Sequence, residues 1–341
     1  MSKKLINAVI LSSLSLGATS VYADESVTVT PKNFVRAESD LYLSAQVKDG
    51  GLGKLYNRRD VASVQNQTII RLNRDTLYSS GVYDLDAGPV KITMPDTKGR
   101  FQSLQVISED HYTPFVIYDK GTYVFNKENI GTRYVLFGFR TLVNPNDPKD
   151  VNAAHAVQDQ IKIEQANGPG KFEIPKWDLV SQKKVRDALL VLSETLSDTN
   201  GMFGKKNEVD PVLHLIGSAS AWGGNPETEA TYLNITPKQN DGKTVYKLSV
   251  KDVPVDEFWS VSVYNEQGYY QPNELNSYNL NSVTAQKAKD GSITIQFGAC
   301  NKTTVNCIPI VKGWNYMVRL YRPQASILNG TWHFPEAQPI K

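Results

Sequence analysis

Hydrophobic and polar residues alternate over two long stretches of the chain, residues 63–139 and 231–322. A period of two is typical of strands that bury one face. Short turn segments such as Ala87-Gly88-Pro89 and Asn240-Asp241-Gly242 separate the alternating runs. Each stretch therefore predicts an antiparallel β-sandwich. The expected strands are Thr68–Leu72, Val82–Asp86, Val90–Met94, Phe101–Ile107, Gly121–Phe125, Arg133–Phe139, Tyr232–Ile235, Val245–Val250, Phe258–Tyr264, Ile293–Phe297 and Tyr316–Tyr321.

Helical patterns precede the first stretch and separate the two. A helix is expected over residues 36–47, and Asp147, Asp178 and Asp210 each have the position of an N-cap before an apolar helical face. Asn167-Gly168-Pro169-Gly170 is the strongest break in the chain. We therefore predict a mainly β protein with a helical bridge (α+β). Its parts are an N-terminal sandwich over residues 24–170, the bridge over 171–226, and a C-terminal, jelly-roll-like sandwich over 227–341.

The first residues follow the pattern of a secretory signal peptide. Lys3 and Lys4 precede an apolar run, Leu5–Leu16, and Val21-Tyr22-Ala23 forms a small-residue cleavage signal. We expect a signal peptide over residues 1–23, cleavage after Ala23, and a periplasmic or secreted mature protein. An uncleaved anchor is disfavoured because the apolar run is short.

Charge and composition narrow the classes of partner. The full chain of 341 residues carries a formal charge of +2, and removal of residues 1–23 with their two lysines makes it zero. A neutral chain is not expected to bind nucleic acid, and nothing attracts it to a membrane after signal cleavage. The sequence has no P-loop and no dinucleotide-binding fingerprint, so it identifies no cofactor.

Two cysteines, Cys300 and Cys307, flank a polar, turn-rich segment. In an exported protein such a pair predicts a disulfide that closes a hairpin loop. Metal binding is not expected there, since no histidine lies close in the sequence. His155, His214 and His333 also lack the spacing of a metal site, and no metal ligand is predicted.

Glu109-Asp110-His111-Tyr112 holds the candidate catalytic residues. On a strand, Glu109 and His111 would share one face, with Asp110 and Tyr112 on the other. The carboxylate of Glu109 or Asp110 would then orient His111 as a general acid or base. A purely structural interpretation stays open, in which these side chains bond to the backbone at a turn before Pro114.

A second polar motif, Asn73-Arg74-Asp75-Thr76-Leu77-Tyr78, supplies the candidate ligand-binding residues Asn73, Arg74, Asp75 and Tyr78, to which Tyr112 is added. Arg74 could bind a substrate carboxylate, or pair with Asp75 or Asp110 within the domain. We expect Arg74 or Asp75 to share one pocket with Glu109 and His111.

Aromatic residues offer another surface. Tyr269 and Tyr270 follow Gly268 in a loop and are the better exposed candidates for stacking on a flat ligand or sugar. Trp259 lies within a strand pattern, which favours core packing. His214, on a short apolar helix, is expected to be a packing residue.

The motifs together resemble two known families. Asn73–Tyr78, Asp110-His111-Tyr112-Thr113 and Gly131–Val135 resemble the bacterial domain-of-unknown-function family 1254. Asp252-Val253-Pro254, Phe258–Val261 and Gly313–Tyr316 before Arg319–Pro323 resemble family 1214. This resemblance spans roughly residues 35–335. It implies an exported two-domain protein with a jelly-roll-like second domain, and no established reaction.

Two functions are consistent with these residues, and the sequence does not decide whether the protein is an enzyme. In the first, a small-molecule or substrate pocket forms around the two polar motifs near the domain junction, with acid-base hydrolysis as the candidate chemistry. In the second, a non-catalytic envelope protein binds carbohydrate or assembles into a homo-oligomer.

Overall fold

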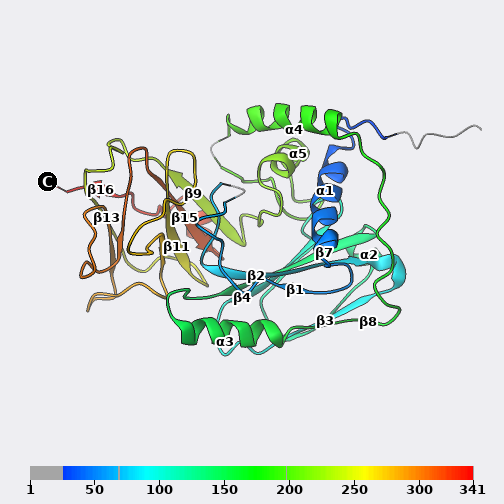
Figure 1. The fold of residues 1–341 in the computed structure, drawn as a ribbon, viewed down its shortest axis with the longest axis horizontal. Coiled ribbons are helices and arrows are strands. Elements are labelled where there is room, and N and C mark those ends of the chain that lie inside the picture. Colours follow the sequence, from blue (N-terminus) through cyan, green and yellow to red (C-terminus); the bar gives the residue numbers. More distant parts are fainter. Residues whose placement is uncertain (1–25, 68–69, 197, 341) are drawn as a thin grey trace, which may run out of the picture.

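The computed structural model describes residues 26–67, 70–196 and 198–340. Two domains lie side by side, one mixed and one built almost wholly of strands (Figure 1). This arrangement of mainly antiparallel sheets, with β13 and β14 as a parallel pair, confirms the predicted fold class. The predicted signal peptide lies outside the described residues. No helix in the described ranges has the length and apolar character needed to span a membrane.

A five-stranded sheet with the order β1-β2-β7-β4-β5 is the centre of the N-terminal domain. Its neighbouring strands are antiparallel, and residues on β7 alternate between two buried surfaces. Val135, Phe137 and Phe139 face one side, whereas Tyr134 and Leu136 face the other. The strands are β1 (Tyr56–Asn57), β2 (Thr76–Asp84), β4 (Gln102–Ser108), β5 (Phe115–Ile117) and β7 (Tyr134–Leu142).

A smaller sheet with the order β6-β3-β8 packs on the first of these surfaces. Val90, Ile92 and Met94 alternate along β3 and enter the same apolar core as Val135 and Phe137, which makes this part a sandwich. The elements are β3 (Val90–Met94), β6 (Gly121–Phe125) and β8 (Lys162–Gln165), with the short helices η1 (Leu85–Ala87) and α2 (Lys127–Ile130) between strands.

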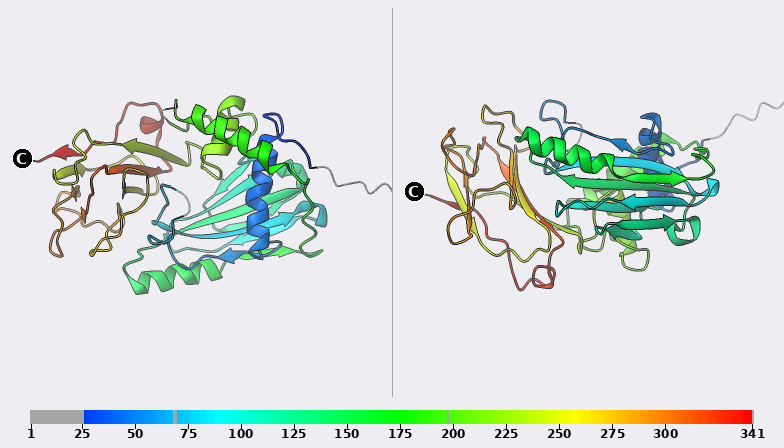
Figure 2. Two further views of the ribbon diagram at one scale, coloured as in Figure 1. Left: turned by 45° about the horizontal axis from the view of Figure 1, so that its top comes forward. Right: turned by 90° about the horizontal axis from the view of Figure 1, so that it is seen from below.

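Three helices, α1 (Phe34–Lys48), α4 (Leu179–Ser193) and α5 (Pro211–Ser220), cover the opposite surface of the five-stranded sheet (Figures 1 and 2). Asp178 and Asp210 accept backbone N–H groups at the starts of α4 and α5, as their capping patterns predict. Both helices pack against α1, so the segment predicted as a bridge forms a helical layer on the N-terminal domain. Helix α3 (Pro148–Asp159) packs beside β7.

The C-terminal domain consists of two four-stranded sheets with the orders β14-β13-β10-β16 and β12-β11-β15-β9. Their facing sides share one core, which includes Trp259 and Trp314. Two four-stranded sheets packed face to face agree with the jelly-roll-like prediction. The elements are β9 (Ala230–Ile235), β10 (Tyr246–Val250), β11 (Trp259–Tyr264), β12 (Asn279–Asn281), β13 (Ile293–Phe297), β14 (Cys307–Ile308), β15 (Asn315–Tyr321), α6 (Ala325–Leu328) and β16 (Gln338–Pro339).

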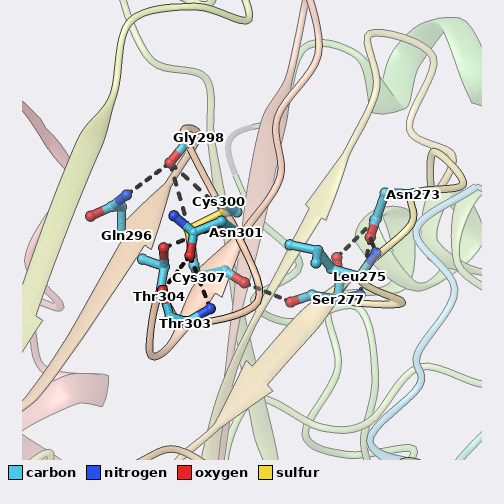
Figure 3. Close-up of a disulfide and its surroundings, with 10 residues drawn as sticks. All are labelled: Asn273, Leu275, Ser277, Gln296, Gly298, Cys300, Asn301, Thr303, Thr304 and Cys307. Atoms are coloured by element: carbon cyan, nitrogen blue, oxygen red, sulfur yellow. Dashed lines mark hydrogen bonds between the residues drawn. A yellow bond between two sulfur atoms is a disulfide. The ribbon is translucent and has the colours of Figure 1, made fainter.

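The predicted disulfide between Cys300 and Cys307 is present. It closes the loop between β13 and β14, where the Gly298 carbonyl lies close to both sulfur atoms (Figure 3). Ser277 donates to the Cys307 carbonyl at 2.7 Å and ties the loop to the segment before β12. The bridge is therefore a local staple at the outer end of the C-terminal domain.

One predicted strand is wrong. Residues 70–72 of the expected strand 68–72 form no strand, and residues 68–69 are not described. The Leu72 carbonyl accepts hydrogen bonds from the hydroxyls of Tyr264 and Tyr270, at 2.8 and 2.7 Å, instead of from a neighbouring strand. An apolar run thus becomes a connection that lies against the other domain.

Candidate functional site

Glu109 to Tyr112 form a turn and not the expected strand end. Strand β4 ends at Ser108, whose backbone N–H bonds to the Tyr112 carbonyl at 2.9 Å. His111 has a φ of 63°, in the left-handed region, and its N–H returns to the Ser108 carbonyl. The predicted alternation of side chains between two faces is therefore wrong, because a tight turn has no period of two.

Arg36 on α1, and not His111, pairs with the acidic residues of this turn. Its guanidinium lies 2.6 Å from an oxygen of Asp110 and 3.4 Å from one of Glu109. Burial raises the pKa of Glu109, an effect that Arg36 partly offsets. Asp40 is fully buried next to Glu109, and burial raises its pKa as well. The turn thus docks α1 onto the sheet through an arginine and a buried pair of carboxyl groups.

His111 is buried within a group of aromatic rings. Its ring lies 5.2 Å from Trp222, 5.6 Å from His214 and 5.7 Å from Phe203, centroid to centroid. Its Nε2 accepts the backbone N–H of Gly223 at 2.8 Å. Burial, with a smaller effect of His214, lowers the pKa of His111 to about 3. The ring is therefore neutral near pH 7 and holds the 222–225 loop, in place of the expected contact with a carboxylate.

Tyr112 and His214 complete this aromatic group. Their rings stack at 4.5 Å with an angle of 7° between their planes. Both ring nitrogens of His214 lie 3.1 Å from backbone carbonyls, those of Met202 and Asp110. His214 is thus a buried packing residue whose two ring nitrogens both face backbone carbonyls, as expected.

Asn73 and Tyr78 meet at the boundary between the domains. The Asn73 side-chain amide donates to the hydroxyl of Tyr78 at 3.3 Å and to that of Tyr321, on β15, at 3.0 Å. Tyr78 and Tyr321 both interact with the guanidinium of Arg140, and Asn73 bonds to both tyrosines. The structure therefore brings two predicted ligand-binding residues together with residues of the C-terminal domain.

Arg74 and Asp75 take part in contacts between the domains. Arg74 donates to the carbonyl of Ala62 and lies over the ring of Tyr278, 5.2 Å from its centroid. Asp75 is fully buried, and its Oδ1 accepts from Asn279 at 2.7 Å and Asn281 at 3.2 Å. Neither residue contacts Glu109 or His111 in the described chain, so the expectation of one shared pocket is wrong.

Arg140, which the sequence did not single out, is the central charge at this boundary. It lies on β7 directly opposite Tyr78 on β2, with its guanidinium 5.6 Å from the centroid of the Tyr78 ring. Its Nη1 donates to Gln105 at 2.6 Å and to Asn225 at 3.2 Å, and its Nη2 donates to the Gly223 carbonyl at 3.3 Å. The signal in the sequence that could have identified Arg140 is the presence of an arginine within the largely buried run of β7.

The 222–225 loop joins the two predicted motifs. It follows α5, where the helical layer stops, and Gln105 holds it by donating to the Gly224 carbonyl at 2.8 Å. Gly223 contacts His111 through its N–H and Arg140 through its carbonyl. The Glu109–Tyr112 turn is thus connected to the Asn73–Tyr78 motif through this loop, without direct contact among the described residues.

The C-terminal domain presents a polar sheet face to this boundary. Tyr232, Arg319, Ser260 and Asn281 form one row across β9, β15, β11 and β12. The alternate residues of these strands point into the apolar core. Arg319 is buried and donates to Ser262, Tyr264 and the carbonyls of residues 71 and 72. A polar layer therefore separates the two domains.

Tyr269 and Tyr270 differ from the expected exposed pair. Tyr270 is buried, and its hydroxyl donates to the Leu72 carbonyl, so its expected exposure is wrong. Tyr269 is half-buried. Gln67 explains the difference, because its side chain bonds to both the N–H and the carbonyl of Tyr270 and folds the loop against the N-terminal domain.

Two hollows are lined by residues other than Asn73, Tyr78 and Arg140. A groove of about 670 Å³ runs over the smaller sheet beside Lys91, Val124 and Glu164. A cavity of about 30 Å³, near Tyr264 and Tyr278, has room for about one water molecule. Within the described ranges, no group of three or more histidine, cysteine or acidic side chains is arranged to hold a metal ion.

The fold defines a class of two-domain β-sandwich proteins with a polar layer between the domains. Residues 52–165 match the family described as "Protein of unknown function (DUF1254)", and residues 230–325 match "Protein of unknown function (DUF1214)". The chain combines an N-terminal DUF1254 domain with a C-terminal DUF1214 domain, which confirms the resemblance found in its motifs.

Solved structures share this arrangement. The VPA0106 protein from Vibrio parahaemolyticus has a TM-score of 0.71 at 20% sequence identity, over 90% of this chain and 96% of that one. An uncharacterized protein from Burkholderia cenocepacia has a TM-score of 0.51 at 11% identity, over 91% and 88% of the two chains. Both similarities concern the fold alone. No curated protein matches the chain.

Proposed function

We propose that this protein binds a small molecule rich in hydrogen-bond acceptors at the junction of its two domains, around Asn73, Tyr78 and Arg140. We call this region the junction site and define it by those three residues with Tyr232 and Tyr321. Ligand sites in proteins favour boundaries between domains.

The observation that carries the proposal is a surplus of donors. The hydroxyls of Tyr78, Tyr232 and Tyr321 each accept a hydrogen bond from an asparagine amide. None of them donates in a hydrogen bond of the described chain. A phenol can do both, so three O–H donors stay available. An acceptor-rich ligand would satisfy them.

The surrounding contacts hold these groups in place. Asn225 bonds to both Tyr232 and Arg140, and Asn73 links Tyr78 of the first domain to Tyr321 of the second. Side chains that are already held by such hydrogen bonds lose little conformational freedom when a ligand binds. His111 acts in this proposal as a positioning residue, because it holds Gly223 and through it the loop beside Arg140.

A thermal-shift screen of small polar compounds tests the junction site. Compounds that stabilise the wild type are measured again with Tyr78→Phe and Asn73→Ala, and with Tyr56→Phe as the matched control on an exposed tyrosine. We expect the first two variants to weaken binding about tenfold, as the loss of one hydrogen bond does, and the control to leave it unchanged. Binding that survives both changes would refute the proposal.

We also propose that the mature protein is exported. The amino-terminal pattern of residues 1–23 and the Cys300–Cys307 disulfide both fit an oxidising compartment outside the cytoplasm. Amino-terminal sequencing of the purified protein should begin at Asp24, and a sequence that begins at Ser2 or Met1 would contradict cleavage.

A further inference from the structure

We infer that the ligand of the junction site carries one carboxylate group and that Arg140 receives it. This inference rests on the proposed junction site and adds the chemical class of its ligand. It comes from the charge of Arg140, its free donors and the contacts of the charges around it.

Arg140 is a half-buried cation without a carboxylate partner in the described chain. Its Nη1 and Nη2 donate to uncharged oxygens, those of Gln105, Asn225 and Gly223, and the Tyr78 side chain is a further uncharged hydrogen-bond partner. A guanidinium has five N–H donors, of which both on Nη1 and one on Nη2 are used. The Nε and Nη2 atoms lie along one edge of the guanidinium, which is an arrangement that binds a carboxylate through two parallel hydrogen bonds.

The acidic residues nearby are already bonded elsewhere. Glu229 accepts the hydroxyl of Tyr118 at 2.7 Å, and Asp75 accepts the amides of Asn279 and Asn281. Neither forms an ion pair with Arg140. A partly desolvated charge gains most from a partner of opposite sign, so the position favours an anion from outside the chain.

A single negative charge fits better than two. Arg319, another cation at this boundary, donates to Ser262, Tyr264 and two backbone carbonyls. Arg319 is 3% exposed and Arg140 is half-buried, so of these two arginines only Arg140 is accessible to an anion from outside the chain. The tyrosine hydroxyls supply neutral donors. A phosphate dianion usually requires further positive charge or backbone N–H groups. One carboxylate matches what the junction site supplies.

The rings around Arg140 indicate the rest of the ligand. Tyr78 lies beneath the guanidinium, and Tyr232 and Tyr321 interact with it electrostatically. Aromatic rings present an apolar face as well as a hydroxyl. A short aliphatic or aromatic monocarboxylate would place its acid group at Arg140, its apolar part against these rings and any further oxygen atoms at their hydroxyls.

Matched ligands separate this inference from the proposed function. Calorimetric titrations with butyrate and benzoate are compared with butyramide and benzamide, and with inorganic phosphate and sulfate. We expect a carboxylate to bind at least tenfold more tightly than its amide, and phosphate and sulfate to bind more weakly than either carboxylate. This comparison uses only the wild type, so it does not depend on the folding of a variant.

Variants of Arg140 complete the test. Arg140→Gln should lower carboxylate affinity at least tenfold, and Arg140→Lys should lower it less, since it keeps the charge but loses the two parallel bonds. Arg58→Gln, on an exposed arginine bonded to Ser80, is the matched control. Circular dichroism and thermal unfolding confirm that each variant is folded.

Each outcome decides one of the two claims. If amides bind as tightly as carboxylates and Tyr78→Phe weakens both, the junction site holds and the carboxylate inference is overturned. Preferential binding of phosphate or sulfate also overturns it. If no compound binds, or if substitutions at Arg140, Tyr78 and Asn73 all leave the affinity unchanged, both the inference and the proposed function are refuted.

Discussion

His111 and Arg140 bind the same residue from opposite sides. The Nε2 of His111 accepts the N–H of Gly223 at 2.8 Å, and the Nη2 of Arg140 donates to its carbonyl at 3.3 Å. A buried neutral imidazole and a half-buried cation thus fix one peptide segment above β7. This relationship makes the 222–225 loop the physical connection between the aromatic group and the junction site.

Alanine substitutions at the two glycines of this loop should differ in cost. Gly223 has a φ of 79°, and a Cβ there would make only an ordinary contact with Ile107 at 3.9 Å, so Gly223→Ala should lower the free energy of unfolding by about 1 kcal/mol through backbone strain. A Cβ on Gly224 would lie 2.4 Å from the Phe203 ring, and Gly224→Ala should cost about 3 kcal/mol. Urea denaturation measures both. The reverse order would show that the loop is not packed as described.

His111 should make stability depend on acid pH. Its pKa of about 3 in the folded protein lies below the ordinary value, so between pH 6.5 and 3 the unfolded chain takes up a proton that the folded one excludes. The free energy of unfolding therefore decreases as the pH decreases, by at most about 1.4 kcal/mol per pH unit from this group.

His111→Asn is the matched variant, because asparagine tolerates the left-handed backbone and offers an acceptor to Gly223. We expect the stability advantage of the wild type over this variant to shrink from pH 7 to pH 5, as measured by urea denaturation. A difference that does not change with pH would mean that His111 takes up a proton as readily in the folded protein as in the unfolded chain.

Asp40 should act in the opposite direction. Burial raises its pKa, so the folded protein retains a proton on this group to higher pH than the unfolded chain does. Stability from this group is therefore present at low pH and is lost as pH rises above about 4 through the raised pKa. Asp40→Asn keeps an acceptor for the Trp177 Nε1–H, now 2.8 Å from the carboxylate, and should gain stability relative to the wild type between pH 5 and 8. The exposed Asp60→Asn should show no such gain.

Tyr270 should contribute to the contact between the domains. Tyr270→Phe removes its hydrogen bond to the Leu72 carbonyl, which keeps the one from Tyr264. We therefore expect a loss of about 1 kcal/mol in the free energy of unfolding and faster proteolysis near residue 70. Tyr56→Phe serves as the exposed control, and equal stability of the two variants would argue against this contact.

Local signals in the sequence predicted much of the fold. The aspartates before α3, α4 and α5 form the expected caps because capping depends on a few adjacent residues. Alternation likewise located β3 and β13. Residues 70–72 were wrongly predicted as part of a strand. The side chains that bond to this segment, Tyr264 and Tyr270 among them, lie about 190 residues away in the sequence.

The candidate site was less accessible to local reasoning. Asn73 and Tyr78 do lie at the junction site. The position of Arg140, however, depends on its bonds to Gly223 and Asn225, more than 80 residues later in the chain. His111 takes its role from the same loop, 112 residues away. No pattern within one motif encodes such contacts.

The most direct measurement of the central claim follows the Nε–H resonance of Arg140 in protein labelled with [¹⁵N]arginine, assigned by its loss in Arg140→Lys. Titration with benzoate should shift this resonance and saturate, whereas benzamide should leave it in place. A titration that shifts other arginines but not Arg140, or that shifts none, would contradict a carboxylate-binding site at the junction of the two domains.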